Sequence, residues 1–381
     1  MNVVRVMKRL DSSGALVPAG TGAPGAGPAA TARRPGAMFD DAPLLVIWEV
    51  TRACALACAH CRADAIARRD PRELTTAEGC ALLDQVAAFG APAPLVVLTG
   101  GDPMWRRDLP ELVAYGTRLG LKVALTPSGT AAATRQRLRE LRDAGLRRVA
   151  VSLDAASAET HDGFRGVRGS FTWTRRIIGD AVALGLPLQI NTTVSAWTLS
   201  GLRDMASFVR TLPLELWAVF FLVQTGRGAS LAQISAAECE DALTFLAGLS
   251  RDVPFAIKTT EAPHYRRVLR EAGLASRFPG VNDGNGFVFV DHVGNICPSG
   301  FLPITCGNVR QDALSNVYRR DPTFRLLRDP DALGGRCGRC EYRTTCGGSR
   351  SRAFAETGDF LAEDPLCSYQ PASSGAALAG R

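Results

Sequence analysis

The sequence predicts an α/β protein built on parallel strands, and three observations lead to that class. From Leu44 onward, six short apolar runs alternate with longer amphipathic segments, in units of about 25–40 residues. The apolar runs are nearly continuous, which is typical of parallel strands covered on both faces. The chain has 381 residues, 46% of them hydrophobic, which is enough for a sizeable core. These observations fit a doubly wound sheet or an incomplete (β/α) barrel, and both folds place function at the carboxyl ends of the strands.

The expected elements follow one another regularly up to about residue 250. The strands are expected at 44–48, 95–99, 122–126, 148–153, 188–194 and 217–223. The helices are expected near 77–89, 108–119, 134–144, 172–185, 200–211 and 235–248. After this alternation ends, residues 286–296 hold a Gly-Asn turn between alternating apolar residues and predict a hairpin. A polar helix is expected around 311–329, before a cysteine-rich stretch at 337–367.

Composition and charge divide the chain and exclude two kinds of partner. Residues 1–36 are rich in Gly and Pro and hold five basic residues against one acid, so much of the net charge of +7 lies there. We expect a disordered extension at 1–40, a main domain at 41–250, a smaller one at 251–370 and a disordered tail at 371–381. No run of 18 apolar residues predicts a membrane span. No stripe of Lys and Arg with interleaved aromatic residues predicts a nucleic-acid groove.

The eleven cysteines are the most informative feature of the composition. Their odd number excludes full pairing in disulfides, and no secretory apolar segment precedes them. A cytoplasmic location is therefore expected. In a reducing compartment, clustered cysteines more often bind metal or carry out redox chemistry.

The first cysteine set follows the first predicted strand. Cys54, Cys58 and Cys61 have the spacing CxxxCxxC and offer three thiolates from one loop. Thiolates are the usual ligands of iron–sulfur clusters, and zinc is the competing metal. Three ligands leave a fourth coordination position open, which suits a chemically active site better than a structural one. The alternative is one buried helix face on which the thiols serve as small apolar side chains.

This loop resembles the signature of the radical S-adenosylmethionine (SAM) superfamily, with His60 at the position that is commonly aromatic. The resemblance covers roughly residues 44–225 and implies a partial (β/α)6 TIM-like barrel. It implies that Cys54, Cys58 and Cys61 hold a [4Fe–4S] cluster whose open iron binds SAM. In that family, one electron cleaves SAM to a 5′-deoxyadenosyl radical, which abstracts hydrogen from the substrate. A reductant such as flavodoxin or ferredoxin is implied as a partner.

Motifs at later strand ends agree with this resemblance. The second strand runs into Gly100-Gly101-Asp102-Pro103, which resembles the family's GGEP motif, with Asp in place of Glu; that motif's backbone contacts the SAM amino group. The resemblance implies further contacts to the ribose and methionine parts of SAM from Ser128, Ser152, Asp154 and Asn191. It places Arg165 where a basic side chain meets the SAM carboxylate. The alternative for each is an ordinary turn or helix cap.

The second cysteine set comprises Cys337, Cys340, Cys346 and Cys367. Four cysteines that open with CxxC satisfy either a zinc ion or a [4Fe–4S] cluster. The segment resembles the SPASM/Twitch auxiliary-cluster extension, a small α+β domain, which implies an auxiliary [4Fe–4S] cluster. It departs from the full seven-cysteine pattern, because Arg350 stands where another cysteine is expected.

The remaining cysteines have simpler interpretations. Cys297 and Cys306 are either ligands of an incomplete site or packing thiols, and packing is favoured. Cys80 and Cys239 lie in predicted helices and are expected in the core.

The nearest resemblance is to radical SAM proteins that modify heme precursors. It implies a small-molecule substrate, with a tetrapyrrole side chain favoured over a peptide. A non-catalytic iron–sulfur electron-transfer protein remains a second class. The general acid or base is not identified, since Asp291, His292 and His264 are equally compatible with turn or surface positions.

Overall fold

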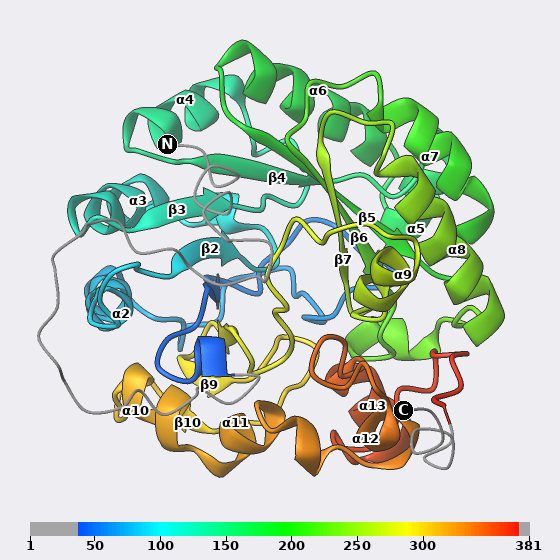
Figure 1. Ribbon diagram of the computed structural model, residues 1–381. Helices are drawn as coiled ribbons and strands as arrows, with labels where there is room; N and C mark the ends of the chain where they lie inside the picture. The colour runs from blue at the N-terminus through cyan, green and yellow to red at the C-terminus, as the bar shows by residue number, and fades with distance from the viewer. Residues whose placement is uncertain (1–36, 373–381) are drawn as a thin grey trace, which may run out of the picture.

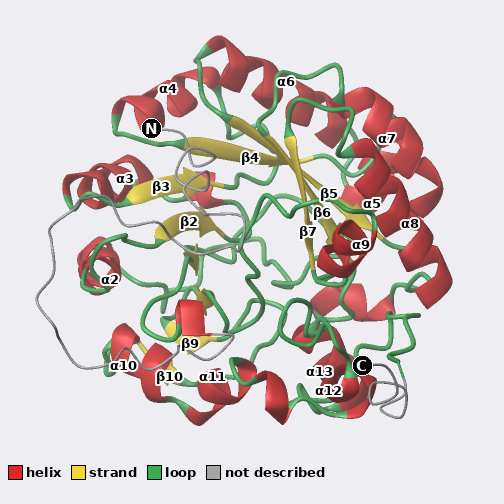
Figure 2. Ribbon diagram, in the orientation of Figure 1, coloured by secondary structure: helices red, strands yellow, loops and turns green. Residues whose placement is uncertain are grey.

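One sheet organises the molecule in the computed structural model, which describes residues 37–372. Its strand order is β10-β9-β8-β1-β2-β3-β4-β5-β6-β7, and the strands from β8 to β7 in that order are mutually parallel. Figure 1 shows this curved sheet with helices α2 to α8 around its outside and helices α10 to α13 gathered below it. The arrangement is a partial barrel, as Figure 2 also shows from the central position of the strands.

The six predicted strands are confirmed within a few residues. They are β1 (Leu45–Glu49), β2 (Leu95–Thr99), β3 (Lys122–Leu125), β4 (Arg148–Ser152), β5 (Leu188–Val194) and β6 (Leu216–Phe221). The remaining strands of the described residues are β7 (Ala256–Thr260), β8 (Phe287–Val290), β9 (Asn295–Cys297) and β10 (Gly307–Asn308).

Two parallel strands were not predicted as part of the barrel. Strand β7 lies beside β6, and the sequence did not reveal it because only Ala256 and Ile257 of its five residues are apolar. The predicted hairpin is confirmed as the antiparallel pair β8–β9, but β8 also pairs in parallel with β1. The sheet therefore continues past the boundary expected near residue 250. The expected extension at 1–40 and tail at 371–381 lie almost wholly outside the described residues.

In the described part of the chain, six of the helices from α2 to α9 confirm the expected amphipathic segments, and the other two were not expected. In chain order, all eight are α2 (Thr76–Ala87), α3 (Leu109–Arg118), α4 (Arg135–Asp143), α5 (Ala158–Arg165), α6 (Ser170–Ala183), α7 (Leu202–Val209), α8 (Ala236–Leu249) and α9 (Tyr265–Glu271). The C-terminal helices are α10 (Leu314–Arg320), α11 (Pro322–Leu327), α12 (Gly335–Arg339) and α13 (Arg350–Thr357). Short 3-10 helices occur at Ala37–Phe39, Pro103–Trp105, Leu199–Gly201, Gly226–Ser230 and Pro330–Ala332.

Capping residues explain where the two clearest helices begin. Thr75 and Glu78 form a reciprocal capping box at the start of α2, and Ser235 with Glu238 does the same for α8. The sequence did not predict α5, α9 or α13, which have only seven or eight residues each.

The nearly continuous apolar runs predicted strands that are covered on both faces. That expectation is wrong for β2 and β5, whose two faces are not equally covered. In β2 and β5, buried and partly exposed residues alternate along the strand. The buried residues belong to the core that packs against the helices. The alternate residues face the inside of the curve, where a row across four strands holds Ser152, Asn191, Ala218 and Lys258. The inner face is therefore partly polar and partly accessible, as a barrel that receives a ligand requires.

No helix in the described part of the chain is both long and apolar enough to cross a lipid bilayer.

Candidate active site

The first cysteine set lies in the loop that leaves the carboxyl end of β1. Residues 54–61 form no helix, so the alternative of a buried helix face is wrong. Cys58 is buried, and the other two thiols are partly exposed. The Leu56 amide donates to Cys54 Sγ at 3.3 Å, and the Ala65 amide donates to Cys61 Sγ at 3.5 Å. Such N–H···S bonds stabilise sulfur ligands that carry negative charge.

The Gly-Gly turn after β2 packs directly against the start of this loop. The Gly101 amide donates to the Thr51 carbonyl at 2.7 Å, and the Asp102 amide donates to the Ala53 carbonyl at 2.6 Å. A Cβ on Gly101 would lie 2.4 Å from the Ala53 oxygen, and one on Gly100 would lie 2.3 Å from the Thr51 oxygen. Only glycine permits this approach, so the motif supports the backbone of the cysteine loop.

Asp102 is a fully buried residue that joins three strand-end loops. One carboxylate oxygen accepts from the Met104 amide at 3.2 Å, and the other accepts from the Thr130 hydroxyl at 2.5 Å. The Ser128 hydroxyl donates to the Gly101 carbonyl. Pro103 begins the short 3-10 helix that follows. The structure therefore brings Asp102 and Ser128 together beneath the cysteine loop, where their side chains bond to the protein itself.

A buried ion pair connects the end of β4 to Cys58. The Arg165 guanidinium lies 2.6 Å from Asp154 Oδ2, and its Nη1 donates to Cys58 Sγ at 3.8 Å. Asp154 also accepts from the Thr193 amide at 2.9 Å. Burial alone would raise the pKa of Asp154, but the Arg165 charge lowers it below its ordinary value. Both side chains are thus charged, and Arg165 is directed at the thiol as well as toward Asp154.

Two histidines in this region, the partly exposed His60 and the buried His161, were given no chemical role from the sequence. His60 stacks on Phe164, with ring centroids 4.1 Å apart, and burial lowers its pKa to about 3. His161 accepts from the Asp154 amide at 3.2 Å, and burial lowers its pKa to about 4. Both rings are therefore neutral at physiological pH. Helix α5 carries Phe164, His161 and Arg165. This helix therefore holds the cysteine loop in place from the barrel side.

The other predicted strand-end residues lie on the inner face of the sheet. Asn191 accepts from the Gln189 side chain at 2.7 Å, and Ser152 lies in the same row. Lys258 ends this row and was not singled out from the sequence. No hydrogen bond or ion pair involves its ammonium among residues 37–372, and burial together with nearby Arg148 lowers its pKa to about 8.

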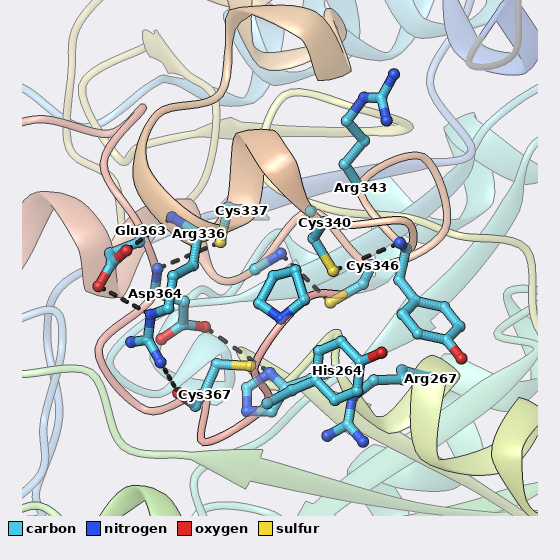
Figure 3. Close-up of a pocket in the computed structure, with 15 residues that line it drawn as sticks. His264, Arg267, Arg336, Cys337, Cys340, Arg343, Cys346, Glu363, Asp364 and Cys367 are labelled. Atoms are coloured by element: carbon cyan, nitrogen blue, oxygen red, sulfur yellow. Dashed lines mark hydrogen bonds and ion pairs between the residues drawn. The ribbon is translucent and has the colours of Figure 1, made fainter. Parts of the chain in front are cut away.

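The second cysteine set lines one pocket at the C-terminal side of the barrel. Cys337, Cys340, Cys346 and Cys367 all contribute to its lining. Figure 3 shows their sulfur atoms around the pocket. Cys337, Cys340 and Cys346 accept backbone N–H bonds at 3.4–3.5 Å from Asp364, Tyr342 and Gly348. Within residues 37–372, no three metal-ligating side chains converge closely enough to hold a single metal ion.

The donor set of this pocket fits an iron–sulfur cluster. Four thiols surround it and backbone amides point at three of them, a chemistry typical of such sites. Burial raises the pKa of Cys346 to about 12 and that of Cys367 to about 11, so metal binding must displace their protons.

Cys297 and Cys306 lie apart from this pocket. Cys297 ends β9 and Cys306 directly precedes β10, and neither lines the pocket. Burial raises the pKa of each thiol to about 12. Cys239 is a buried core residue, as expected, and its thiol lies 3.4 Å from His264.

The three acid–base candidates have different surroundings. Asp291 accepts from the Val293 and Asn295 amides, so it stabilises the β8–β9 turn. His292 lies 3.0 Å from the Glu49 carboxylate at the end of β1. His264 lines the second pocket, 3.8 Å from Asp364, and burial lowers its pKa to about 4.

A buried polar cluster that was not predicted from the sequence joins the second pocket to the barrel. Glu261 follows β7 with a φ of 58°, which is rare for a residue other than glycine. It accepts from Ser349, and burial next to Asp283 raises its pKa well above its ordinary value. Arg352 pairs with Asp364 at 3.3 Å and donates to carbonyls at the end of β6.

Comparisons with known proteins agree with this geometry. A family model described as "Radical SAM superfamily" matches residues 48–209, which include the first cysteine set. The chain is 40% identical to the AdoMet-dependent heme synthase of Oleidesulfovibrio alaskensis, covering 90% of this chain and 92% of that protein. It is 39% identical to the AdoMet-dependent heme synthase of Methanosarcina barkeri, covering 87% and 98%.

More distant relatives include proteins with other names. The Fe-coproporphyrin III synthase of Methanosarcina barkeri is 29% identical, covering 86% of this chain and 88% of that protein. The PqqA peptide cyclase of Rhizobium meliloti is 28% identical, with the same coverage.

Solved structures share the fold. SuiB of Streptococcus suis bound to S-adenosylmethionine has a TM-score of 0.68 at 17% identity, covering 86% of this chain and 77% of that one. The anSMEcpe structure with bound AdoMet has a TM-score of 0.67 at 14% identity, covering 85% and 93%.

Proposed function

The chain belongs to the radical SAM superfamily, and from that premise we propose that it is an AdoMet-dependent heme synthase. Its substrate is then an iron tetrapyrrole from which a side-chain hydrogen is abstracted. The observation that supports this proposal is the match to two heme synthases along nearly their whole length. The roles proposed for individual residues of this chain follow from the general chemistry of the family.

The loop site is assigned to the catalytic cluster. Cys54, Cys58 and Cys61 hold a [4Fe–4S] cluster that, with SAM bound, supplies the 5′-deoxyadenosyl radical. The chain's own part is to hold the loop in place. Gly100 and Gly101 support its backbone, and the Asp154–Arg165 pair places a charge at Cys58. Ser152 and Asn191, on the inner face, are the proposed contacts to SAM.

The second pocket is assigned to an auxiliary [4Fe–4S] cluster held by Cys337, Cys340, Cys346 and Cys367. Hydrogen abstraction leaves a substrate radical, and completing an oxidation requires that one electron leave it. A redox-active centre within the same chain would accept that electron. Metal analysis distinguishes an auxiliary [4Fe–4S] cluster from a structural zinc ion. About eight iron atoms per chain would support two clusters, whereas about four iron atoms with one zinc ion would contradict the assignment.

Activity on a defined tetrapyrrole tests the proposal directly. The reconstituted chain is given SAM, dithionite and iron coproporphyrin III under anaerobic conditions, and products are followed by mass spectrometry. We expect 5′-deoxyadenosine together with consumption of the tetrapyrrole and formation of heme. Formation of 5′-deoxyadenosine without any change in the tetrapyrrole would favour the peptide alternative, which the PqqA peptide cyclase similarity keeps open. No 5′-deoxyadenosine with both clusters intact would favour a non-catalytic electron-transfer protein.

Substrate binding is expected to depend on Lys258. Arg148 is neutralised by Glu215 at 2.7 Å, so among the described residues Lys258 is left as an unpaired cation on the inner face. Such a cation suits a propionate carboxylate of the tetrapyrrole. Replacing Lys258 by Met is expected to weaken binding of iron coproporphyrin III about tenfold, equivalent to about 1.4 kcal/mol. Absorbance titration measures the affinity, and the uncharged methyl ester of the same porphyrin is the control, since its affinity should not change.

The same lysine predicts a pH dependence. Its pKa is lowered to about 8, so the cation is present below that value and is lost as pH rises through it. Affinity of the wild-type chain for the porphyrin acid should therefore fall above about pH 8, whereas that of Lys258→Met should stay flat. A parallel titration with SAM shows whether the lysine serves the SAM carboxylate instead. Equal affinity of both proteins for both ligands at pH 7 would contradict the assignment.

A further inference from the structure

Arg350 occupies a position at the second pocket that the proposed reaction does not yet explain. In the sequence it stands where the seven-cysteine pattern has another ligand, four residues after Cys346. In the structure its side chain is almost completely buried, with 1% exposed. A buried guanidinium is costly unless the surrounding atoms compensate for lost water. Its surroundings therefore indicate what the charge does.

Arg350 contacts one thiol and three backbone carbonyls. Its Nη2 donates to Cys337 Sγ at 3.6 Å. Its remaining donors bind the carbonyls of Gly348, Phe360 and Ala362 at 3.3, 3.0 and 2.6 Å. These carbonyls are neutral, and the nearby Asp364 is paired with Arg352. Within residues 37–372, Arg350 forms no ion pair with a carboxylate, so Cys337 is the only thiolate or acid that its charge contacts directly.

The backbone before Arg350 explains why the guanidinium reaches this thiol. Gly347 and Gly348 both adopt positive φ values, 73° and 67°, which reverses the chain directly after Cys346. A Cβ on Gly348 would lie 2.4 Å from Arg350 Nη2 and 3.0 Å from Cys337 Sγ. No larger residue fits between them. The two glycines thus let the segment from Cys346 to Arg350 fold over Cys337.

We propose that Arg350 raises the reduction potential of the auxiliary cluster by acting through Cys337. This inference rests on the proposed assignment of the second pocket to a [4Fe–4S] cluster. Reduction adds one negative charge to a cluster, and a buried cation stabilises the reduced form more than the oxidised form. The N–H···S bond acts in the same direction, and the Asp364 amide adds a second donor to the same sulfur. The cation thereby favours acceptance of an electron from the substrate radical.

The reduction potential of the auxiliary cluster is the measurement that tests this. The full chain carrying Cys54→Ala, Cys58→Ala and Cys61→Ala retains only the second cysteine set. An anaerobic redox titration followed by electron paramagnetic resonance then reports on that cluster alone. Three variants are compared in this background: Arg350→Gln removes the charge, Arg350→Lys keeps it, and Arg343→Gln is the control. Arg343 also lines the pocket, but it pairs with Asp331 and points away from the sulfur atoms (Figure 3).

We expect Arg350→Gln to shift the potential to more negative values, with Arg350→Lys between it and the parent and Arg343→Gln unchanged. An equal shift in both glutamine variants would overturn the inference, because the effect would then be general electrostatics. An unchanged potential in Arg350→Gln, or loss of iron from both Arg350 variants, would also overturn it and leave Arg350 a purely structural role. A parent that binds no iron–sulfur cluster would instead contradict the assignment of the pocket itself.

Discussion

Replacing Cys58 by Ala is expected to abolish formation of 5′-deoxyadenosine. Of the three loop thiols, Cys58 is the buried one, and it receives the Arg165 guanidinium. A [4Fe–4S] cluster with only two loop ligands left cannot be held with an open iron for SAM. Iron content should fall from about eight to about four atoms per chain, because the second set of cysteines is intact. Metal analysis and chromatography of the nucleoside product check the two parts of this expectation.

Cys80→Ala is the matched control for that experiment. Cys80 lies on α2, partly buried against the hydrophobic core and outside both cysteine sets. Its loss should leave the iron content and 5′-deoxyadenosine formation near those of the parent. Appreciable 5′-deoxyadenosine from Cys58→Ala, or equal losses from both variants, would refute the assignment of the loop.

Replacing Gly101 by Ala is expected to cause the second largest loss, without touching any ligand. The added Cβ would lie 2.4 and 2.5 Å from the Ala53 and Arg52 carbonyl oxygens, so the start of the cysteine loop must shift. Overpacking of this kind costs about 1–3 kcal/mol. We expect the melting temperature to fall by a few degrees and 5′-deoxyadenosine formation to fall at least tenfold, with partial loss of the loop iron.

A glycine in open space provides the comparison. Gly179 lies in α6, and a Cβ there would meet nothing within 4 Å. Gly179→Ala should be neutral or stabilise the chain by up to about 1 kcal/mol, since Ala is the better helix former. Calorimetry and the nucleoside assay are applied to both variants. The structural interpretation of the Gly-Gly turn fails if Gly101→Ala behaves like Gly179→Ala.

Local patterns in the sequence were sufficient to predict most of the barrel and both cysteine sets. The six strands from β1 to β6 are apolar and of ordinary length, and the cysteine spacings are visible within eight or a few tens of residues. The Gly-Gly turn was also visible, because consecutive glycines mark close backbone approach. The strands, the cysteine spacings and the Gly-Gly turn are each determined by residues that lie close together in the sequence.

Contacts between distant segments could not be predicted in the same way. Glu261 and Ser349 are 88 residues apart, and neither stands in a recognisable motif. Arg350 was noticed only as a missing cysteine, since nothing local indicates that its side chain folds back to Cys337. Lys258 stands in a short half-polar strand whose place beside β6 depends on the whole barrel. Such residues acquire their surroundings only when the chain has folded.

The pairing of β1 with β8 has a consequence for how the protein is made. Strand β1 has β2 on one side and β8 on the other, and β8 ends at Val290. While the chain is being synthesised from its N-terminus, one edge of β1 stays unpaired until just over three quarters of the protein exists. The three loop cysteines directly follow that unfinished strand. Iron can therefore be inserted into a folded cysteine loop only late, after the ribosome has synthesised the C-terminal part that completes the sheet.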